Sequence, residues 1–307
     1  MAIGRLRLKP RGYDFPPYRP PSEANSLLLR VTRGCPWNRC AFCSMYKDMP
    51  FERRPIEEII DDITAAQELY GDAVRTVFIG DSNSIVIRTD DFIRILQALY
   101  TAFPQIERVT SYGRAKTLHK KPAEDLKRLR DAGLTRLHVG LETGDREVLE
   151  LIQKGATPEE MVSAGLKAKK AGFEYSLYVL LGIGGDERWE QHARGTAAVL
   201  NQINPHFIRV RTFIPQPGCV LYEHIKAGTF KKAAHETILR EQKKLIEHLD
   251  VTSTYLSDHL SNYVSVNGKL PEDKHEMISA IDEMLALLST DDGVRKRFIR
   301  KDSLQNL

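Results

Sequence analysis

The sequence predicts an α/β fold, namely a partial or open barrel of six strand–helix units of the TIM type, followed by a mainly helical C-terminal extension. Short apolar, partly β-branched runs alternate with longer segments of helical periodicity over residues 26–214, as expected for parallel strands joined by helices. Polar or glycine-rich turns follow these runs. In such a barrel the chemistry lies at the C-terminal ends of the strands, so these turns are the candidate functional positions.

The first expected strand, Ser26–Thr32, is an apolar run that ends at Arg33 and Gly34. Five later runs share its character, and each is followed by a turn. They are Thr76–Ile79, Arg108–Tyr112, Leu137–Gly140, Tyr175–Leu181 and Phe207–Ile214.

Apolar residues at helical spacing predict helices between these strands. The expected helices are Pro55–Tyr70, Phe92–Phe103, Ala123–Ala132, segments leading to Ala171, and Glu187–Gln202. Past residue 215 two further helices are expected, His235–Leu249 and Asp273–Leu288. We therefore divide the chain into a basic, proline-rich leader (1–22), a barrel (23–215) and an extension (216–307) that we expect to close one side of the barrel.

Composition allows a substantial core, because 42% of the 307 residues are hydrophobic. No apolar run approaches the roughly 18 residues of a membrane span, and residues 1–21 lack the apolar centre of a signal peptide. A cytoplasmic location is expected. The net charge of +4 does not demand nucleic acid, although basic residues gather at both ends. They are Arg5, Arg7, Lys9 and Arg11 at one end, and Arg295, Lys296, Arg297, Arg300 and Lys301 at the other.

Three of the four cysteines, Cys35, Cys40 and Cys43, lie within nine residues directly after the first expected strand. Three thiolates can hold three corners of a [4Fe-4S] cube and leave the fourth iron open to another ligand. A structural zinc site is the alternative, but it needs a fourth ligand, and Cys219 stands far down the chain. A disulfide framework is not expected from so few, so crowded cysteines.

The cysteine loop, with its preceding strand and following helix, resembles that of the radical SAM superfamily. Phe42, directly before Cys43, matches the family pattern, whereas the four residues between Cys35 and Cys40 are one more than is usual. The resemblance implies that S-adenosylmethionine (SAM) binds the open iron, that a cluster electron cleaves it, and that the 5′-deoxyadenosyl radical removes a hydrogen atom from an organic substrate. It also implies a flavodoxin or ferredoxin electron donor. The order of motifs looks like branches related to coproporphyrinogen dehydrogenases and methylthiotransferases.

The same resemblance implies positions for the cofactor. Gly80, Asp81 and Ser82 stand where the family binds the SAM amino group, and an ordinary turn is the alternative. Glu142, in a Gly-x-Glu-x-Gly segment, is expected to accept hydrogen bonds from the ribose or the amine, with a helix-capping acid as the alternative. Arg114 is expected to pair with the cofactor carboxylate, or else in a surface ion pair. Gly182 and Ile214 are expected beside the adenosine, unless Ile214 packs in the core.

Candidates on the substrate side are His138, His259 and Tyr263. His138 follows the alternation of its strand and can point into the barrel or pack as a core histidine. His259 and Tyr263 belong to a polar stretch of the extension that can supply a proton or simply fix a loop. Two other functions stay open, an RNA-modifying enzyme that uses the basic ends and a non-catalytic iron–sulfur or haem carrier.

Overall fold

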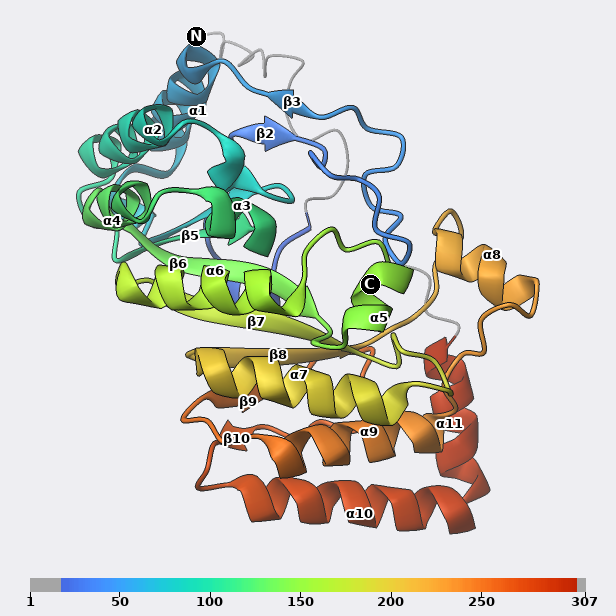
Figure 1. The fold of residues 1–307 in the computed structure, drawn as a ribbon. Helices are drawn as coiled ribbons and strands as arrows, with labels where there is room; N and C mark the ends of the chain where they lie inside the picture. The colour runs from blue at the N-terminus through green and yellow to red at the C-terminus, as the bar shows by residue number, and fades with distance from the viewer. Residues whose placement is uncertain (1–17, 303–307) are drawn as a thin grey trace, which may run out of the picture.

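The computed structural model describes residues 18–302 and centres on one eight-stranded sheet (Figure 1). The basic residues of the predicted leader, Arg5 to Arg11, lie outside the described residues. The three-part division of the chain stays a prediction. Within the described range, no helix is both long and apolar enough to cross a membrane.

Six parallel strands form the first part of the sheet, as predicted, and they follow one another in sequence order. They are β1 (Leu27–Arg30), β4 (Thr76–Gly80), β5 (Arg108–Gly113), β6 (Leu134–Glu142), β7 (Glu174–Leu181) and β8 (Phe207–Thr212). The sheet continues through β9 (Thr254–Leu256), parallel to β8, and ends at β10 (Gly268–Lys269), antiparallel to β9. Since its order runs from β1 to β10 without closing, the barrel is open.

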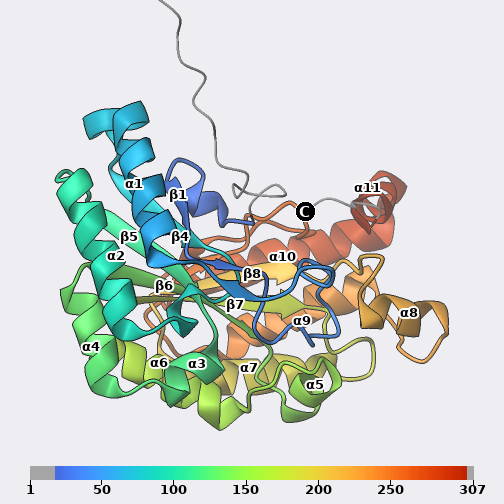
Figure 2. The ribbon, with the colours of Figure 1, turned by 90° about the horizontal axis from the view of Figure 1, so that it is seen from above.

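Helices form an arc around the outside of the strands (Figure 2). The long helices of the barrel are α1 (Ile56–Tyr70), α2 (Thr89–Ala102), α4 (Ala123–Asp131), α6 (Pro158–Lys170) and α7 (Trp189–Ile203), close to their predicted positions. The start of α6 shows why the sequence places a helix there: Thr157 and Glu160 form a reciprocal capping box, and Pro158 occupies the first turn. The shorter helices are α3 (Ala115–Lys120), α5 (Arg146–Leu151) and α8 (Val220–Lys226).

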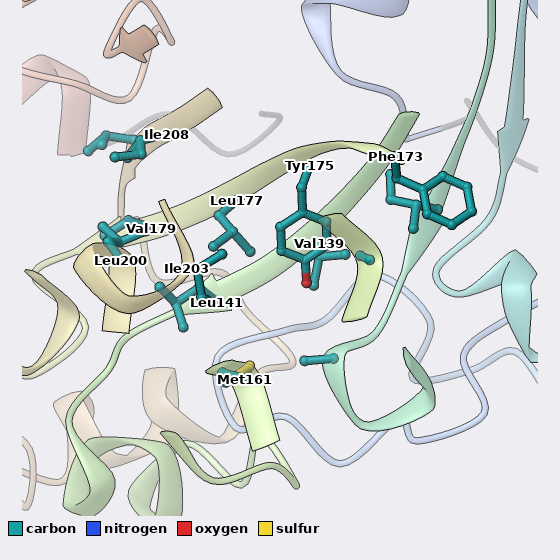
Figure 3. Close-up of a cluster of buried hydrophobic side chains, with 14 of the residues drawn as sticks. Val139, Leu141, Met161, Phe173, Tyr175, Leu177, Val179, Leu200, Ile203 and Ile208 are labelled. Carbon is teal, nitrogen blue, oxygen red and sulfur yellow. The ribbon is translucent and has the colours of Figure 1, made fainter. Parts of the chain in front are cut away.

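The main core fills the space between sheet and helices (Figure 3). Val139 and Leu141 of β6 and Leu177 and Val179 of β7 lie in this core with helix residues such as Leu200. Because successive residues of a strand point to opposite faces, the even-numbered residues of β6 and β7 face the inside of the barrel. This alternation decides which side chains can reach a substrate.

The extension contains the two predicted helices, observed as α9 (His235–His248) and α10 (Lys274–Thr290), and ends in α11 (Asp292–Asp302). It also supplies β9 and β10, which the sequence analysis missed. Asn262 ties the extension to the sheet, since its Nδ2 donates to Val210 O at 2.8 Å and its Oδ1 accepts from Thr212 Oγ1 at 3.0 Å. The extension therefore continues the barrel wall from the edge of β8.

Candidate functional site

The three clustered cysteines lie on the loop between β2 (Thr32–Arg33) and β3 (Glu52–Arg53), which pair with each other. Cys35, Cys40 and Cys43 are partly exposed, and all four cysteines of the chain are free. The backbone N–H of Asn38 donates to Cys35 Sγ at 3.4 Å. Asn38 itself has φ +47°, a left-handed conformation that asparagine tolerates, within the longer spacing between Cys35 and Cys40.

The loop is fixed against the segment that follows α5, as the approach of the two in Figure 1 shows. Ala41 N–H donates to Ile152 O at 2.8 Å, and Trp37 Nε1 donates to Gln153 O at 2.7 Å. Gly155 makes this contact possible, because a Cβ there would lie 2.4 Å from the Trp37 ring. The cysteine positions are thus set by long-range contacts as well as by the loop itself.

Asp81 and Ser82, predicted to bind the cofactor, hold the start of the cysteine loop. The Asp81 carboxylate accepts from Arg30 Nε at 3.1 Å, and both side chains are almost fully buried. The Gly34 backbone also donates to Asp81, and Ser82 Oγ donates to Gly34 O at 2.9 Å. Burial raises the pKa of Asp81 above its ordinary value, although Arg30 opposes this. Both side chains therefore act on Gly34, the residue before Cys35, while Gly80 ends β4 beside them.

Glu142 and Lys154 form a largely buried ion pair beside the cysteine loop, with Lys154 Nζ 2.7 Å from Glu142 Oε1. Glu142 is the last residue of β6 and has φ +64°. Lys154 Nζ lies 5.7 Å from the centre of the Phe42 ring. Burial alone would lower the pKa of Lys154, but Glu142 and Cys40 raise it above its ordinary value. This keeps a positive charge next to the thiols.

Arg114 brings a second positive charge to the loop. Its Nη2 donates to Lys154 O at 2.8 Å, and its guanidinium lies 5.1 Å from the centre of the Trp37 ring. Burial lowers the pKa of Arg114, and Cys40 and Cys35 oppose that shift. Of the predicted cofactor-binding residues, Arg114 alone lines the groove of about 960 Å³ that runs along the flank of the loop beside α3 and α6. Within residues 18–302, Arg114 forms no ion pair with a carboxylate, so the predicted surface pair is absent.

The donor set fits an iron–sulfur cluster. Three thiols stand on one anchored loop, one of them already accepts a backbone N–H, and two cations lie close by. Burial raises the pKa of Cys40, and raises that of Cys43 to about 11, so these groups lose their protons readily only when iron binds them. No group of three or more metal-binding side chains in the described part of the chain is suited to a single ion.

Gly182 and Ile214 lie near the ends of β7 and β8. Gly182 has φ +77°, and its N–H donates to Glu241 Oε1 at 2.8 Å. Ile214 is 8% exposed and therefore mostly packed. Two fully buried side chains, Glu241 and His192, lie behind Gly182. Glu241 Oε1 and His192 Nε2 are 3.8 Å apart. Burial raises the pKa of Glu241 to about 8 and lowers that of His192 to about 4, so both are neutral near pH 7.

This buried carboxyl should make stability fall as the pH rises. Its folded-state pKa is above its unfolded value of 4.5, so its contribution is full below pH 4.5 and is lost as the pH approaches 8. The lowered pKa of His192 acts in the opposite direction, but only below the ordinary histidine pKa of 6.5. Between pH 6.5 and 8 the free energy of unfolding of the wild type should therefore fall by about 1 to 2 kcal/mol relative to Glu241→Gln. Denaturant titrations at the two pH values test this, and an unchanged difference would contradict it.

The three substrate-side candidates lie in different surroundings. His138 is fully buried on the inner face of β6, with Nε2 3.3 Å from Glu23 Oε1, and its ring lies 6.0 Å from that of Tyr178. His259 Nδ1 lies 2.9 Å from Ser261 Oγ, and burial followed by Arg211 lowers the pKa of His259 to about 4. Tyr263 stacks on Phe298 of α11 at 4.7 Å. Tyr263 is thus packed within the extension.

Several residues of the site were not predicted from the sequence. Lys154 gives no local signal, because its partner Glu142 becomes visible only in the fold. Arg209 and Arg211 do give a local signal, since these two partly exposed residues alternate with the buried Ile208 and Val210 along β8. Such alternation places both arginines on the inner face of the barrel.

Comparisons with known proteins agree with this fold. A model of the radical SAM superfamily matches residues 29–194. An uncharacterized methyltransferase of Pyrococcus horikoshii is 26% identical over 209 residues, which are 66% of this chain and 42% of that protein. The heme chaperone HemW of Bacillus subtilis is 23% identical over 197 residues, 62% of this chain and 51% of that protein. The chain thus spans about half the length of these curated relatives.

Solved structures share the fold at low sequence identity. Methylornithine synthase (PylB) superposes with a TM-score of 0.52 and 17% identity, covering 83% of this chain and 68% of that one. Elp3 of the archaeon Methanocaldococcus infernus superposes with a TM-score of 0.51 and 16% identity. The match covers 76% of this chain and 59% of that one. At these identities the likeness concerns the fold alone.

Proposed function

Because the chain belongs to the radical SAM superfamily, we propose that it reductively cleaves SAM at a [4Fe-4S] cluster and abstracts a hydrogen atom from an organic substrate. The observation that supports this most is the anchored loop with three free thiols at the C-terminal edge of an open parallel barrel. When bound, the cluster supplies the electron that cleaves SAM, and the 5′-deoxyadenosyl radical then takes the hydrogen atom.

We assign Cys35, Cys40 and Cys43 as the iron ligands. Arg30, Asp81 and Ser82 position them through Gly34. Lys154 and Arg114 place positive charge beside the thiolates, and a cluster with three thiolate ligands carries negative charge that these cations offset.

We assign the SAM side to residues along the same edge. Glu142 is held by Lys154 and has a second carboxylate oxygen with which to accept hydrogen bonds from a ribose hydroxyl or an amine. Gly80 supplies backbone hydrogen-bonding groups at the end of β4, and Phe42 lies on the cysteine loop. Gly182 and Ile214 lie on the side that we assign to the adenosine of SAM. Arg114 can pair with the SAM carboxylate, since no protein carboxylate in the described range occupies it.

An external reductant is part of this proposal. Cluster potentials span roughly −700 to +450 mV, and reducing a sulfonium requires the low end of that range, so we propose a flavodoxin or ferredoxin donor. Four free thiols and an oxygen-sensitive cluster suit a reducing, cytoplasmic setting. The two curated relatives differ in the activities their names give, so hydrogen-atom abstraction is the only step that we assign.

SAM cleavage tests the proposal directly. Protein reconstituted anaerobically with iron and sulfide, and reduced with dithionite, should convert SAM to 5′-deoxyadenosine, measured by liquid chromatography. A protein that binds iron and sulfide but yields no 5′-deoxyadenosine would instead support a non-catalytic carrier. RNA modification would require salt-dependent RNA binding, and its absence at low salt would exclude that function.

A further inference from the structure

The inner face of the barrel carries two arginines, Arg209 and Arg211. Arg209 and Arg211 alternate with the core residues Ile208 and Val210 on β8, so both project to the inside. Both are partly exposed and therefore reachable from solvent. Each guanidinium lies over an aromatic ring, Arg209 over Phe207 at 5.8 Å and Arg211 over Tyr178 at 5.1 Å. In the described part of the chain neither forms an ion pair with a carboxylate.

The carboxylates nearest to this face do not neutralise the two arginines. Glu23 is engaged by His138 at 3.3 Å, by Arg108 at 3.3 Å and by Arg136 at 3.9 Å. Asp258, on the loop of the extension, is exposed and makes no ion pair within residues 18–302. The inner face beside β8 therefore keeps a net positive charge.

Three buried hydrogen-bonding atoms of the same patch have no hydrogen-bond partner among residues 18–302. They are Ser176 Oγ, Tyr178 Oη and Arg209 Nε. The strand register joins them, because Tyr178 pairs with Arg209 and Ser176 pairs with Phe207. Buried polar atoms are normally hydrogen-bonded, so a cluster of unpaired groups that can all donate points to a ligand that accepts. Ser176 is fully buried and Tyr178 is 9% exposed.

The patch lies next to the proposed cofactor site. Glu142 of β6 and Val210 of β8 both pair with Val179 of β7, so Arg209 and Arg211 bracket the level of Glu142. Two strand spacings separate the backbones, which is about 10 Å. A small molecule held by these arginines would therefore lie beside a cofactor that Glu142 contacts.

We propose that Arg209, Arg211 and Tyr178 form the substrate subsite of the barrel, and that it binds an oxyanion group, a carboxylate or a phosphate, of a small organic substrate. Paired guanidinium groups bind such groups through parallel hydrogen bonds, and a neutral tyrosine hydroxyl adds a third donor. That this subsite binds the substrate rests on the proposed function. Anion binding by the subsite requires neither the cluster nor SAM.

Calorimetric titration of the full chain tests the subsite. Succinate and inorganic phosphate serve as separate probes, and uncharged succinamide is the control ligand. The wild type should bind at least one anion and not succinamide, and the tighter of the two anions identifies the group. Arg211→Gln and Arg209→Gln should each weaken that binding about tenfold or more, equivalent to about 1.4 kcal/mol. Arg75→Gln is the matched control, because Arg75 is exposed and its side chain donates to Gln105 at the other end of the sheet.

Two milder variants separate a loss of anion binding from a loss of the fold. Tyr178→Phe removes a hydroxyl that has no protein partner, so it should keep the fold and still weaken anion binding. Arg211→Lys keeps the charge and should bind with intermediate affinity. Equal affinity in wild type and all four variants of the subsite, or binding of neither anion by the wild type, would overturn the inference. SAM cleavage without anion binding would refute the subsite alone, whereas anion binding without SAM cleavage would refute the proposed function alone.

Discussion

Replacing Cys40 with alanine should abolish SAM cleavage and leave the reconstituted protein with little or no bound iron. Cys40 is one of three thiols on the loop, and the fourth cysteine of the chain, Cys219, is buried outside it. A cluster that loses one of three thiolate ligands has no replacement. Iron and sulfide content, the visible absorption of the cluster and the yield of 5′-deoxyadenosine measure the effect.

Cys219→Ala is the matched control for this change. Cys219 is 1% exposed and packs in an apolar cluster with Phe213, Leu221 and Ala41 of the cysteine loop, so it is a buried neighbour of the loop and not a member of it. The control should keep both its iron and its activity. Normal iron content and activity in Cys40→Ala, or loss of both in Cys219→Ala, would show that the wrong thiols have been assigned.

Asp81→Asn should cost about 3 to 5 kcal/mol of the free energy of unfolding. The substitution removes the charge that balances Arg30 at 3.1 Å, in a place where the two side chains are 3% and 2% exposed. Removing the charge of one partner of a buried ion pair is costly because water does not replace the lost interaction. The variant should also bind iron less well, because Asp81 holds Gly34 directly before Cys35. Denaturant unfolding of the apo-protein and iron content after reconstitution measure the two effects.

Asp90→Asn is the control for this second prediction. It breaks an Arg–Asp pair of similar chemistry, between Arg128 Nη2 and Asp90 Oδ1 at 2.6 Å, in which both side chains are well exposed. Water solvates both charges there, so the stability should not change measurably. Equal effects of Asp81→Asn and Asp90→Asn would contradict the role given to the buried pair.

The parallel strands could be predicted from sequence because each is a buried apolar run closed by a turn. β9 could not, because its three residues, Thr254 to Leu256, form no apolar run. That segment becomes a strand by pairing with β8 on one side and with β10 on the other. Tertiary pairing, which local composition does not record, therefore decides where this sheet ends.

The candidate site could likewise be predicted only where a local sequence pattern marks it. The spacing of Cys35, Cys40 and Cys43 marks the loop without any knowledge of the fold. The carboxylate of Asp81 suggested a contact with the cofactor, but its partner Arg30 lies 51 residues away in sequence and meets it only when β1 and β4 pair. The inward position of Arg209 and Arg211 could have been predicted from their alternation with apolar residues. Long-range pairs such as Glu142 with Lys154 required the structure.

The most direct test of the central claim is the electron paramagnetic resonance spectrum of the reduced, anaerobically reconstituted wild type, recorded with and without SAM. A three-thiolate cube with one open iron should give about four iron ions per chain and a spectrum that changes when SAM is added. Protein that stays colourless and iron-free after reconstitution, or a cluster spectrum that SAM leaves unchanged, would contradict the assignment.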